Sequence, residues 1–389
     1  MNNRTIIHLD LDTFFVSVER LLNSSLIGKP IIIGGTSDRG IVSSCSYEAR
    51  RFGVHSAMPI RTAKQLCSDA ILIRGDMEEY SKQSRLVTDI ISEHAPIYEK
   101  ASIDEHYIDI TGMDRFFGSF RWSKELRERI IKHTGLPISF GLSTNKTVSK
   151  IATGEGKPNG ELHIPQQDIK PFLSPLSIRK IPMIGKQSYR LLRSMGVSTI
   201  RTLSMIPPEM ISQVMGKNGI IAWKKANGID DTPVVQYSER KSISTERTFD
   251  KDTTNIIYLN NLLTSMVEKI SFELRKKQKL AGCVTVKIRY SNFDTHTLQK
   301  HLTYTSFDHI LIQTATELFN RLYTRRMLIR LIGVRFSSLV GGSQQLDIFE
   351  DKPEMIDLYQ AMDNMRLRYG NKAVQRAIGI DVNNNGKNI

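Results

Sequence analysis

Carboxylates in two short stretches of the sequence could gather around a divalent metal ion. Asp104 and Glu105 are adjacent within residues 101–109, where isoleucines and a tyrosine favour a β-strand. A second strand is predicted for residues 6–12, whose alternation places Asp10 and two other polar side chains opposite three apolar ones. Because a buried charge must be paired or must bind a metal, two such strands side by side predict a divalent-metal site.

Two further groups of residues are candidates for binding phosphate. Tyr47 and Arg50 are three residues apart after a run of small residues, so a helix would bring them together as a phosphate clamp. Lys157 lies in the glycine-rich residues 154–160, from which its ammonium group could reach a triphosphate. The alternatives are that Tyr47 and Arg50 are ordinary helix-surface residues and that Lys157 is a solvated loop lysine.

The composition indicates a globular protein with a polyanionic partner. The 389 residues are 40% hydrophobic and 24% charged, and this length allows two to four domains with cores of their own. The formal net charge is +14, and residues 241–340 carry 16 lysine and arginine residues against 8 acidic ones. This excess predicts nucleic acid or a membrane surface as the partner, with a merely basic soluble protein as the alternative.

The sequence lacks the marks of a membrane protein and of a secreted protein. No window approaches 18 consecutive apolar residues, and the apolar segment of a signal peptide is missing near the N-terminus. Cys45, Cys67 and Cys283 are widely spaced and odd in number, which argues against a disulfide framework and against a zinc site. We therefore expect a protein of the reducing cytoplasm.

Strands and helices that alternate in the first part of the chain would position the candidate residues. Strands are predicted at 6–12, 31–33, 101–109 and 137–143, and helices at 13–22, 79–94, 120–133 and from 145 to just before Gly154. This order predicts a split β-α-β layer.

The following segment, residues 166–230, is predicted to be helical with short connections. Within it, residues 181–197 look like a helix-hairpin-helix, which offers free backbone N–H groups at a helix N-terminus to a DNA phosphate. Met183 stands where such a hairpin usually has its first glycine. Plain helical packing is the alternative to DNA binding.

A second α/β layer is predicted after an extended, fairly stiff linker at residues 232–242, which lack helical periodicity and glycine. Its β-α-β-β-α-β order comes from strands near 242–249, 283–290, 296–304 and 329–337 and helices near 255–278 and 308–323. A positive face for duplex DNA is predicted from Arg275, Lys276, Lys277, Lys279, Lys287 and Arg289. A helix near 353–369 and a polar, asparagine-rich tail complete the chain.

Four motifs in this order resemble those of the Y-family DNA polymerases, specifically the bacterial DNA polymerase IV branch. They are DLDTFF at 10–15, YEAR at 47–50, SIDE at 102–105 and KPNG at 157–160. The resemblance extends from about residue 4 to residue 340. It implies an α/β (α+β) right-hand polymerase with a ferredoxin-like palm, small fingers, a helix-hairpin-helix thumb and a β-α-β-β-α-β little finger.

The resemblance also implies the domain boundaries and the activity. The palm would comprise residues 1–12 and 75–165, the fingers 13–74, the thumb 166–231, the linker 232–242, the little finger 243–340 and the C-terminal tail 341–389. The implied activity is template-directed translesion synthesis of low fidelity in DNA damage tolerance. The implied partners are primer-template DNA and deoxynucleoside triphosphates, and we expect a monomer that associates with the nucleoid and not with a membrane.

The family pattern assigns roles to individual residues. Catalysis would use two Mg²⁺ ions held by Asp10, Asp104, Glu105 and the backbone carbonyl of Leu11. An ideal strand would send Asp104 and Glu105 to opposite faces, so both can serve only if the strand bends there. The incoming triphosphate would contact Ser44, Tyr47, Arg50 and Lys157, and Phe15 would exclude a ribose 2′-OH. With small side chains at 43–46 and short fingers, the site would be open to damaged template.

Two features of the sequence extend or depart from this pattern. His106 stands where the family usually has a small residue, and it would either pack in the core or hydrogen-bond near the metal ligands. Residues 345–349 resemble the clamp-binding peptide of bacterial polymerases, in which Gln345, Leu346 and Phe349 would bind the sliding clamp. Packing of the tail is the alternative for this peptide.

Other functions use a similar arrangement of carboxylates. A nucleotide cyclase can share such a palm, but the hairpin and the basic second layer argue against it because a cyclase needs no DNA track. A non-polymerising DNA-binding relative should have lost one or more of the carboxylates. Within the family, the alternative is the catalytic subunit of a DNA polymerase V-like complex.

Overall fold

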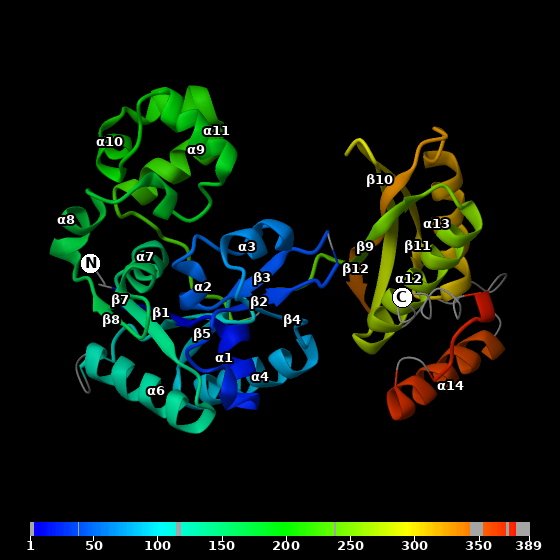
Figure 1. Ribbon diagram of the computed structural model, residues 1–389, viewed down its shortest axis with the longest axis horizontal. Coiled ribbons are helices and arrows are strands. Elements are labelled where there is room, and N and C mark those ends of the chain that lie inside the picture. The colour runs from blue at the N-terminus through cyan, green and yellow to red at the C-terminus, as the bar shows by residue number, and fades with distance from the viewer. Residues whose placement is uncertain are drawn as a thin grey trace. The chain divides into compact units, whose positions relative to one another are not determined.

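Two structural units make up the chain in the computed structural model, Met1–Ser238 and Glu239–Ile389 (Figure 1). The structure describes residues 4–37, 39–113, 118–236, 239–342, 353–370 and 373–378. The boundary between the units falls inside the linker predicted at 232–242. The finer domain boundaries stay a prediction.

A five-stranded sheet is the centre of the first unit, with the strand order β5-β6-β1-β7-β8. Its strands are β1 (Ile6–Leu11), β5 (Ile97–Lys100), β6 (Glu105–Asp109), β7 (Ile138–Ser143) and β8 (Glu161–His163). The central strand β1 is antiparallel to both β6 and β7, whereas β8 is parallel to β7. The N-terminal strand β1 therefore lies between two strands that are about 100 and 130 residues further along the chain.

Helices cover both faces of this sheet. The apolar face of β1, with Ile7, Leu9 and Leu11, packs in one core with α1 (Phe14–Leu22), α4 (Met77–His94) and α6 (Ser119–Thr134). The other face packs against α7 (Lys146–Gly156), and at Gly141 of β7 a Cβ atom would lie 2.3 Å from the Ser149 carbonyl oxygen. Glycine at this position therefore allows α7 to approach the sheet.

Two sequence expectations need correction in this unit. Residues 101–104 form no strand, because the Ser102 hydroxyl accepts from the backbone N–H groups of Asp104 and Glu105 and turns the chain before β6. The helix expected to end before Gly154 instead continues to Gly156. It stops at Lys157, which precedes a proline and has extended backbone angles.

A small three-stranded sheet, with the order β3-β2-β4, lies in the segment predicted to be the fingers. Its elements are η1 (Ser24–Leu26), β2 (Ile31–Gly34), β3 (Val42–Cys45), α2 (Tyr47–Arg50), α3 (Ile60–Leu66) and β4 (Ile71–Ile73). Of these strands only β2 was predicted, and β3 and β4 were not. A buried cluster that includes Ile32, Cys45 and Ala49 packs α2 and α3 against this sheet.

The segment predicted to be the thumb is helical, as expected. It contains η2 (Gln166–Asp168), α8 (Ile169–Leu173), η3 (Ile178–Lys180), α9 (Lys186–Ser194), α10 (Ile200–Met205) and α11 (Pro208–Ala226). The predicted hairpin lies between η3 and α9, and its Met183 has φ of 79°, in the left-handed region that favours glycine. The hairpin therefore keeps the backbone conformation although the glycine is replaced.

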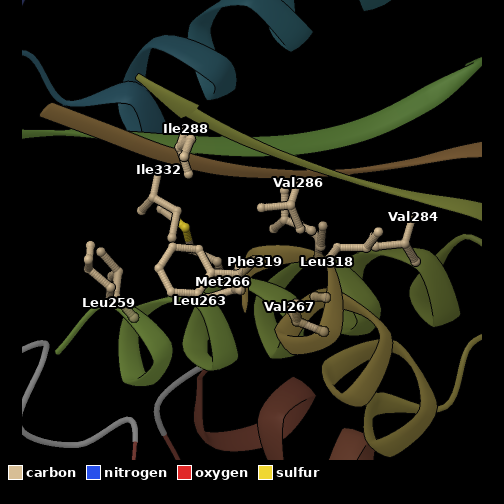
Figure 2. Close-up of a cluster of buried hydrophobic side chains, with 14 of the residues drawn as sticks. Leu259, Leu263, Met266, Val267, Val284, Val286, Ile288, Leu318, Phe319 and Ile332 are labelled. Carbon is tan, nitrogen blue, oxygen red and sulfur yellow. The ribbon is translucent and has the colours of Figure 1, made fainter. Parts of the chain in front are cut away.

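The second unit confirms the predicted β-α-β-β-α-β order. Its elements are β9 (Ser242–Thr253), α12 (Ile256–Lys276), β10 (Lys279–Tyr290), β11 (Thr295–Thr305), α13 (Asp308–Leu322) and β12 (Ile329–Gly341). The strands form one antiparallel sheet in the order β11-β10-β12-β9. Figure 2 shows Leu263, Met266 and Phe319 of the helices packed beneath Val286 and Ile332 of the sheet.

A further helix, α14 (Pro353–Tyr369), confirms the helix predicted near 353–369 and is fastened to the second unit. Arg275 of α12 donates to Asp363 of α14 at 2.6 Å and to Asp308 of α13 at 2.5 Å. Arg275 is therefore a largely buried structural cation, paired with two carboxylates, and not part of the predicted positive face. On the same predicted face, Lys287 is paired with Glu246, which further reduces its charge.

Candidate active site

The three predicted metal-binding carboxylates lie together where the central strand β1 ends beside the start of β6, a place called the corner below. Asp10 of β1 is directly opposite Glu105 of β6 in the antiparallel register. Asp104 precedes β6, and its carbonyl oxygen accepts from the backbone N–H of Leu11 at 3.0 Å. The turn before β6 thus places Asp104 beside the end of β1, and the two adjacent carboxylates are not forced to opposite faces.

Two lysines lie against this corner. Lys150 of α7 donates to both carboxylate oxygens of Glu105, at 2.6 and 2.5 Å. Lys157, just after α7, contacts Asp10. Because α7 packs closely on the sheet, one helix brings both ammonium groups to the carboxylates.

These surroundings shift the pKa values of Asp10 and Glu105 in opposite directions. Burial raises the pKa of Asp10 to about 7, although Lys157 favours its ionised form. Burial would also raise the pKa of Glu105, but the nearby His8, whose Nε2 lies 3.9 Å away, and the hydrogen bonds from Lys150 outweigh it and lower this pKa to about 2. The corner therefore combines a desolvated carboxyl group with one that stays charged.

This donor set fits a hard divalent cation. The predicted ligands supply only carboxylate and carbonyl oxygens, which Mg²⁺ prefers, and a cation would favour the ionised form of the buried Asp10. Among the described residues, no group of three acidic, histidine or cysteine side chains is already gathered around one point at metal-binding distance. The fit therefore rests on the chemistry of the donors and on their shared corner of the sheet.

Asp12 joins three of the four sequence motifs, a role that the sequence did not reveal. This carboxylate is only 1% exposed, and it accepts from the Ser139 hydroxyl and the Asn159 backbone N–H, both at 2.7 Å. It also accepts from the Tyr47 hydroxyl at 3.4 Å. Asp12 thereby ties residue 47 of the predicted fingers and the 157–160 motif to the end of β1.

The predicted triphosphate contacts are only partly brought together. Tyr47 reaches Asp12, and Lys157 lies 3.7 Å from the same carboxylate. Arg50 lies 5.0 Å above the Tyr47 ring, which confirms that α2 places the two side chains together. Ser44 is partly buried on β3, opposite Ile33 of β2, and has no described contact with this cluster.

Phe15 is supported by a second aromatic residue. Its ring stacks on Tyr80 of α4, with a centroid distance of 4.4 Å and an interplanar angle of 12°. Tyr80 is fully buried, and its hydroxyl donates to Glu19 at 2.5 Å. The buried and hydrogen-bonded Tyr80 therefore fixes the position of the Phe15 ring. Tyr80 was missed because an aromatic residue near the start of a helix carries no functional signal in the sequence.

His106 lies on the core face of the sheet. It is opposite Leu9 in the register and only 1% exposed, and its Nε2 is 3.0 Å from the Thr88 hydroxyl of α4. Burial, assisted by the charge of Lys100, lowers its pKa to about 3, so the ring is neutral. These contacts favour the packing interpretation over a hydrogen bond to a metal ligand.

Two other sequence expectations can be compared with the structure only in part. The predicted clamp-binding residues Gln345, Leu346 and Phe349 lie outside the described residues. In the described part of the chain, no helix is long and apolar enough to cross a membrane.

Comparisons with known proteins agree on one family. The model of the impB/mucB/samB family matches residues 9–154, and the model of its C-terminal domain matches residues 240–348. DNA polymerase IV of Dehalococcoides mccartyi strain CBDB1 is 39% identical over 96% of this chain and 97% of that protein. DNA polymerase IV of Desulfatibacillum aliphaticivorans is 36% identical over 97% of each chain.

Solved structures give the same result. A Y-family DNA polymerase chimera of Dbh and Dpo4 aligns with a TM-score of 0.76 and 26% identity. DinB from Sulfolobus solfataricus aligns with a TM-score of 0.60 and 26% identity. Each comparison covers 87% of this chain and 100% of the solved chain.

We predict that His106→Ala lowers the free energy of unfolding by about 2–3 kcal/mol, because it leaves a cavity and removes a buried hydrogen bond. The Mg²⁺ dependence of primer extension should stay that of the parent. Denaturant unfolding and Mg²⁺ titration measure the two effects, with the exposed His133→Ala as the control. A changed Mg²⁺ dependence at unchanged stability would show that His106 acts on the metal ligands instead.

Proposed function

The chain belongs to the impB/mucB/samB family of Y-family DNA polymerases, and we propose from this premise that Asp10, Asp104 and Glu105 are its catalytic residues. The protein is a DNA-directed DNA polymerase that acts in translesion synthesis, so it binds DNA and nucleotides and requires a divalent metal. The single observation that carries the proposal is the register of β1 and β6, which pairs Asp10 with Glu105 next to Asp104.

The three carboxylates and the carbonyl of Leu11 would hold two Mg²⁺ ions. When bound, such ions lower the pKa of the primer 3′-OH and neutralise charge on the triphosphate and the leaving pyrophosphate. The residues of this chain contribute a partly buried site, in which electrostatic contacts are stronger than in water. Lys150 donates to both carboxylate oxygens of Glu105. Asp12 binds Ser139 of β7 and Asn159 of the 157–160 motif through hydrogen bonds.

The incoming deoxynucleotide would be bound by Ser44, Tyr47, Arg50 and Lys157. The two cations are suited to the triphosphate because charge-assisted hydrogen bonds to phosphate are strong. Tyr47 would orient the phosphates through the hydroxyl that already reaches Asp12. Phe15 would meet the sugar, and its stack on Tyr80 would prevent it from moving aside for a 2′-OH.

Primer-template DNA would be held without base readout. Backbone N–H groups at the start of α9, after the Met183 turn, are suited to a phosphate. In the second unit, the sheet face opposite the helices carries Arg335 beside threonine and glutamine side chains, together with Lys287, which is paired with Glu246. Side chains of this kind contact phosphates and sugars of any sequence.

The remaining parts of the proposal concern fidelity and location. Small side chains at 43–46 and a finger sheet of three short strands would leave room for damaged bases. Residues 345–349 would bind the sliding clamp and so keep the enzyme on its template. The enzyme would be a monomer and would associate with the nucleoid. We favour the DNA polymerase IV assignment over a polymerase V-like subunit because the relatives compared are named DNA polymerase IV.

The first prediction concerns the catalytic carboxylates. Asp104→Ala/Glu105→Ala should reduce extension of a primed template with four deoxynucleotides and Mg²⁺ by at least roughly a thousandfold, because preorganised charge stabilisation is removed. Binding of primer-template should remain. Glu125→Ala, at an exposed position of α6, is the control. A parent protein that binds primer-template but adds no nucleotide would favour the non-polymerising alternative.

The second prediction concerns Phe15. We expect Phe15→Ala to reduce discrimination against ribonucleotides by about 100-fold or more, because the bulk that meets the 2′-OH is removed. Single-nucleotide insertion with matched ribo- and deoxynucleotides measures the ratio of kcat/KM values. Phe52→Ala removes an exposed aromatic ring of the fingers segment and should leave the ratio unchanged. An unchanged ratio in Phe15→Ala would refute the assignment.

The third prediction concerns the clamp. Leu346→Ala/Phe349→Ala should weaken binding to the sliding clamp by about 100-fold or more, since each apolar side chain contributes roughly 1.5–3 kcal/mol when buried. Clamp-free primer extension should be unaffected. Leu358→Ala on α14 is a control of similar chemistry. Equal clamp affinity of the double variant and the parent would exclude this peptide as the binding site.

A further inference from the structure

The turn between β10 and β11, residues 291–294, is called the tip below, and it exposes an aromatic ring at the end of the second unit's sheet. Phe293 in this turn is 62% exposed. Its φ is 71°, in the left-handed region that residues other than glycine, asparagine and aspartate rarely adopt. Both features are unfavourable for folding, so the packing of this unit does not explain why a phenylalanine stands here.

Backbone hydrogen bonds hold the tip in one conformation. The N–H of Phe293 donates to the carbonyl oxygen of Tyr290 at 3.0 Å, and the N–H of Tyr290 donates to the carbonyl oxygen of Asp294 at 3.0 Å. The N–H of Ser291 donates to the carbonyl oxygen of Leu328 at 2.9 Å, which joins the tip to the segment before β12. Because the tip is already ordered, a partner that binds the ring meets a preorganised surface.

An arginine side chain from the segment beside the tip lies over the Phe293 ring. The Arg330 guanidinium carbon is 4.6 Å from the ring centroid. A guanidinium stacked on an aromatic ring keeps the N–H groups in its own plane available to a phosphate. Since most of Phe293 stays exposed, a second planar group can stack on the same ring.

Arginine residues are concentrated in the tip's two strands and connecting segments. Residues 289–294 and 321–330 carry five arginine residues and one acidic residue. The acidic residue, Asp294, lies 3.4 Å from Arg325 and therefore offsets part of one charge. Arg325 and Arg326 are both exposed. This excess of positive charge is complementary to a polyanion.

The tip also continues the sheet face that is proposed to hold DNA. Arg289 follows Lys287 by two residues on β10, so the two side chains point to the same face, opposite the helices. Ile288 between them points into the hydrophobic core. The tip begins directly after β10 ends at Tyr290. One nucleic acid could therefore contact the face and the tip together.

We propose that Phe293 and Arg330 bind an unpaired nucleotide, with its base stacked on the ring and its phosphate bound to the guanidinium. A base inside a duplex is covered on both sides by its neighbours, so an unpaired base is the one that offers a face to the ring. In primer-template DNA, the unpaired nucleotides are those of the template ahead of the primer end. The inference rests on the proposed function, for which it names the part of the DNA that the tip contacts.

Binding of two DNA substrates by the full-length protein tests the proposal. Phe293→Asn should weaken binding of a primer-template with a template overhang of about ten nucleotides by roughly tenfold, because one stacked base loses its aromatic partner. Its affinity for a blunt duplex of the same double-stranded length should stay that of the parent. Phe293→Trp keeps an aromatic ring and should retain most of the affinity for the overhang. Tyr369→Asn is the matched control, since Tyr369 is also exposed and lies 5.4 Å from the guanidinium of Arg368.

Stability and salt dependence separate stacking from structural effects and from charge. Asparagine tolerates the left-handed conformation better than phenylalanine does, so Phe293→Asn should not lower the midpoint of thermal unfolding. Arg330→Gln should reduce the slope of log affinity against log salt concentration by about 0.7 for the overhang substrate, because one phosphate contact of a single strand is lost. Phe293→Asn should leave this slope unchanged, since the ring carries no charge.

Three results would overturn the proposal. The first is an unchanged affinity of Phe293→Asn for the overhang substrate. The second is an equal loss of affinity for both substrates, which would place Phe293 against duplex DNA. The third is a lowered unfolding midpoint that accounts for the loss. A parent that extends no primer would contradict the proposed function, whereas the two affinities would still decide the role of Phe293.

Discussion

Several carboxylates are partly buried at the end of β1, and their desolvation is unfavourable unless cations or hydrogen bonds compensate it. The packing of the first unit around β1 provides this compensation. Asp10 and Glu105 face each other on neighbouring strands, and burial, partly offset by Lys157, raises the pKa of Asp10 to about 7. The corner is stable because α7 brings cations to it, and α7 can approach only because Gly141 has no side chain in its way. Gly141, which is far from the proposed metal ligands in sequence, thus helps to set their electrostatic surroundings.

Asp10 and Asp12 differ in their surroundings although only one residue separates them in the sequence. Asp12 is the most buried acidic residue of the corner, and its carboxylate accepts hydrogen bonds from Tyr47, Ser139 and Asn159. It thereby connects the sheet to Tyr47 and to the 157–160 motif. Asp10 is 15% exposed and, apart from its ion pair with Lys157, can bind a ligand from solvent. Two aspartates separated by one residue therefore have different roles, which their degree of burial decides.

Periodicity predicted most of the architecture, because each amphipathic element has only one way to bury its apolar face. The β-α-β-β-α-β order of the second unit and the strand that carries Asp10 are examples. The sequence could not show that Asp104 lies in a turn, since that depends on hydrogen bonds from the Ser102 hydroxyl. Nor could it reveal Lys150, Tyr80 or the pairing of Arg275, because these depend on contacts between distant segments.

The proposed active site requires Asp10, Asp104 and Glu105 to share the catalytic metal ions. The measurement is anomalous scattering from Mn²⁺ in crystals of the protein with primer-template and a non-hydrolysable deoxynucleotide. We expect two Mn²⁺ peaks about 3.5–4 Å apart that contact these three carboxylates and the triphosphate. Peaks bound elsewhere, or a triphosphate whose metal ions make no contact with Asp10 and Asp104, would contradict this assignment.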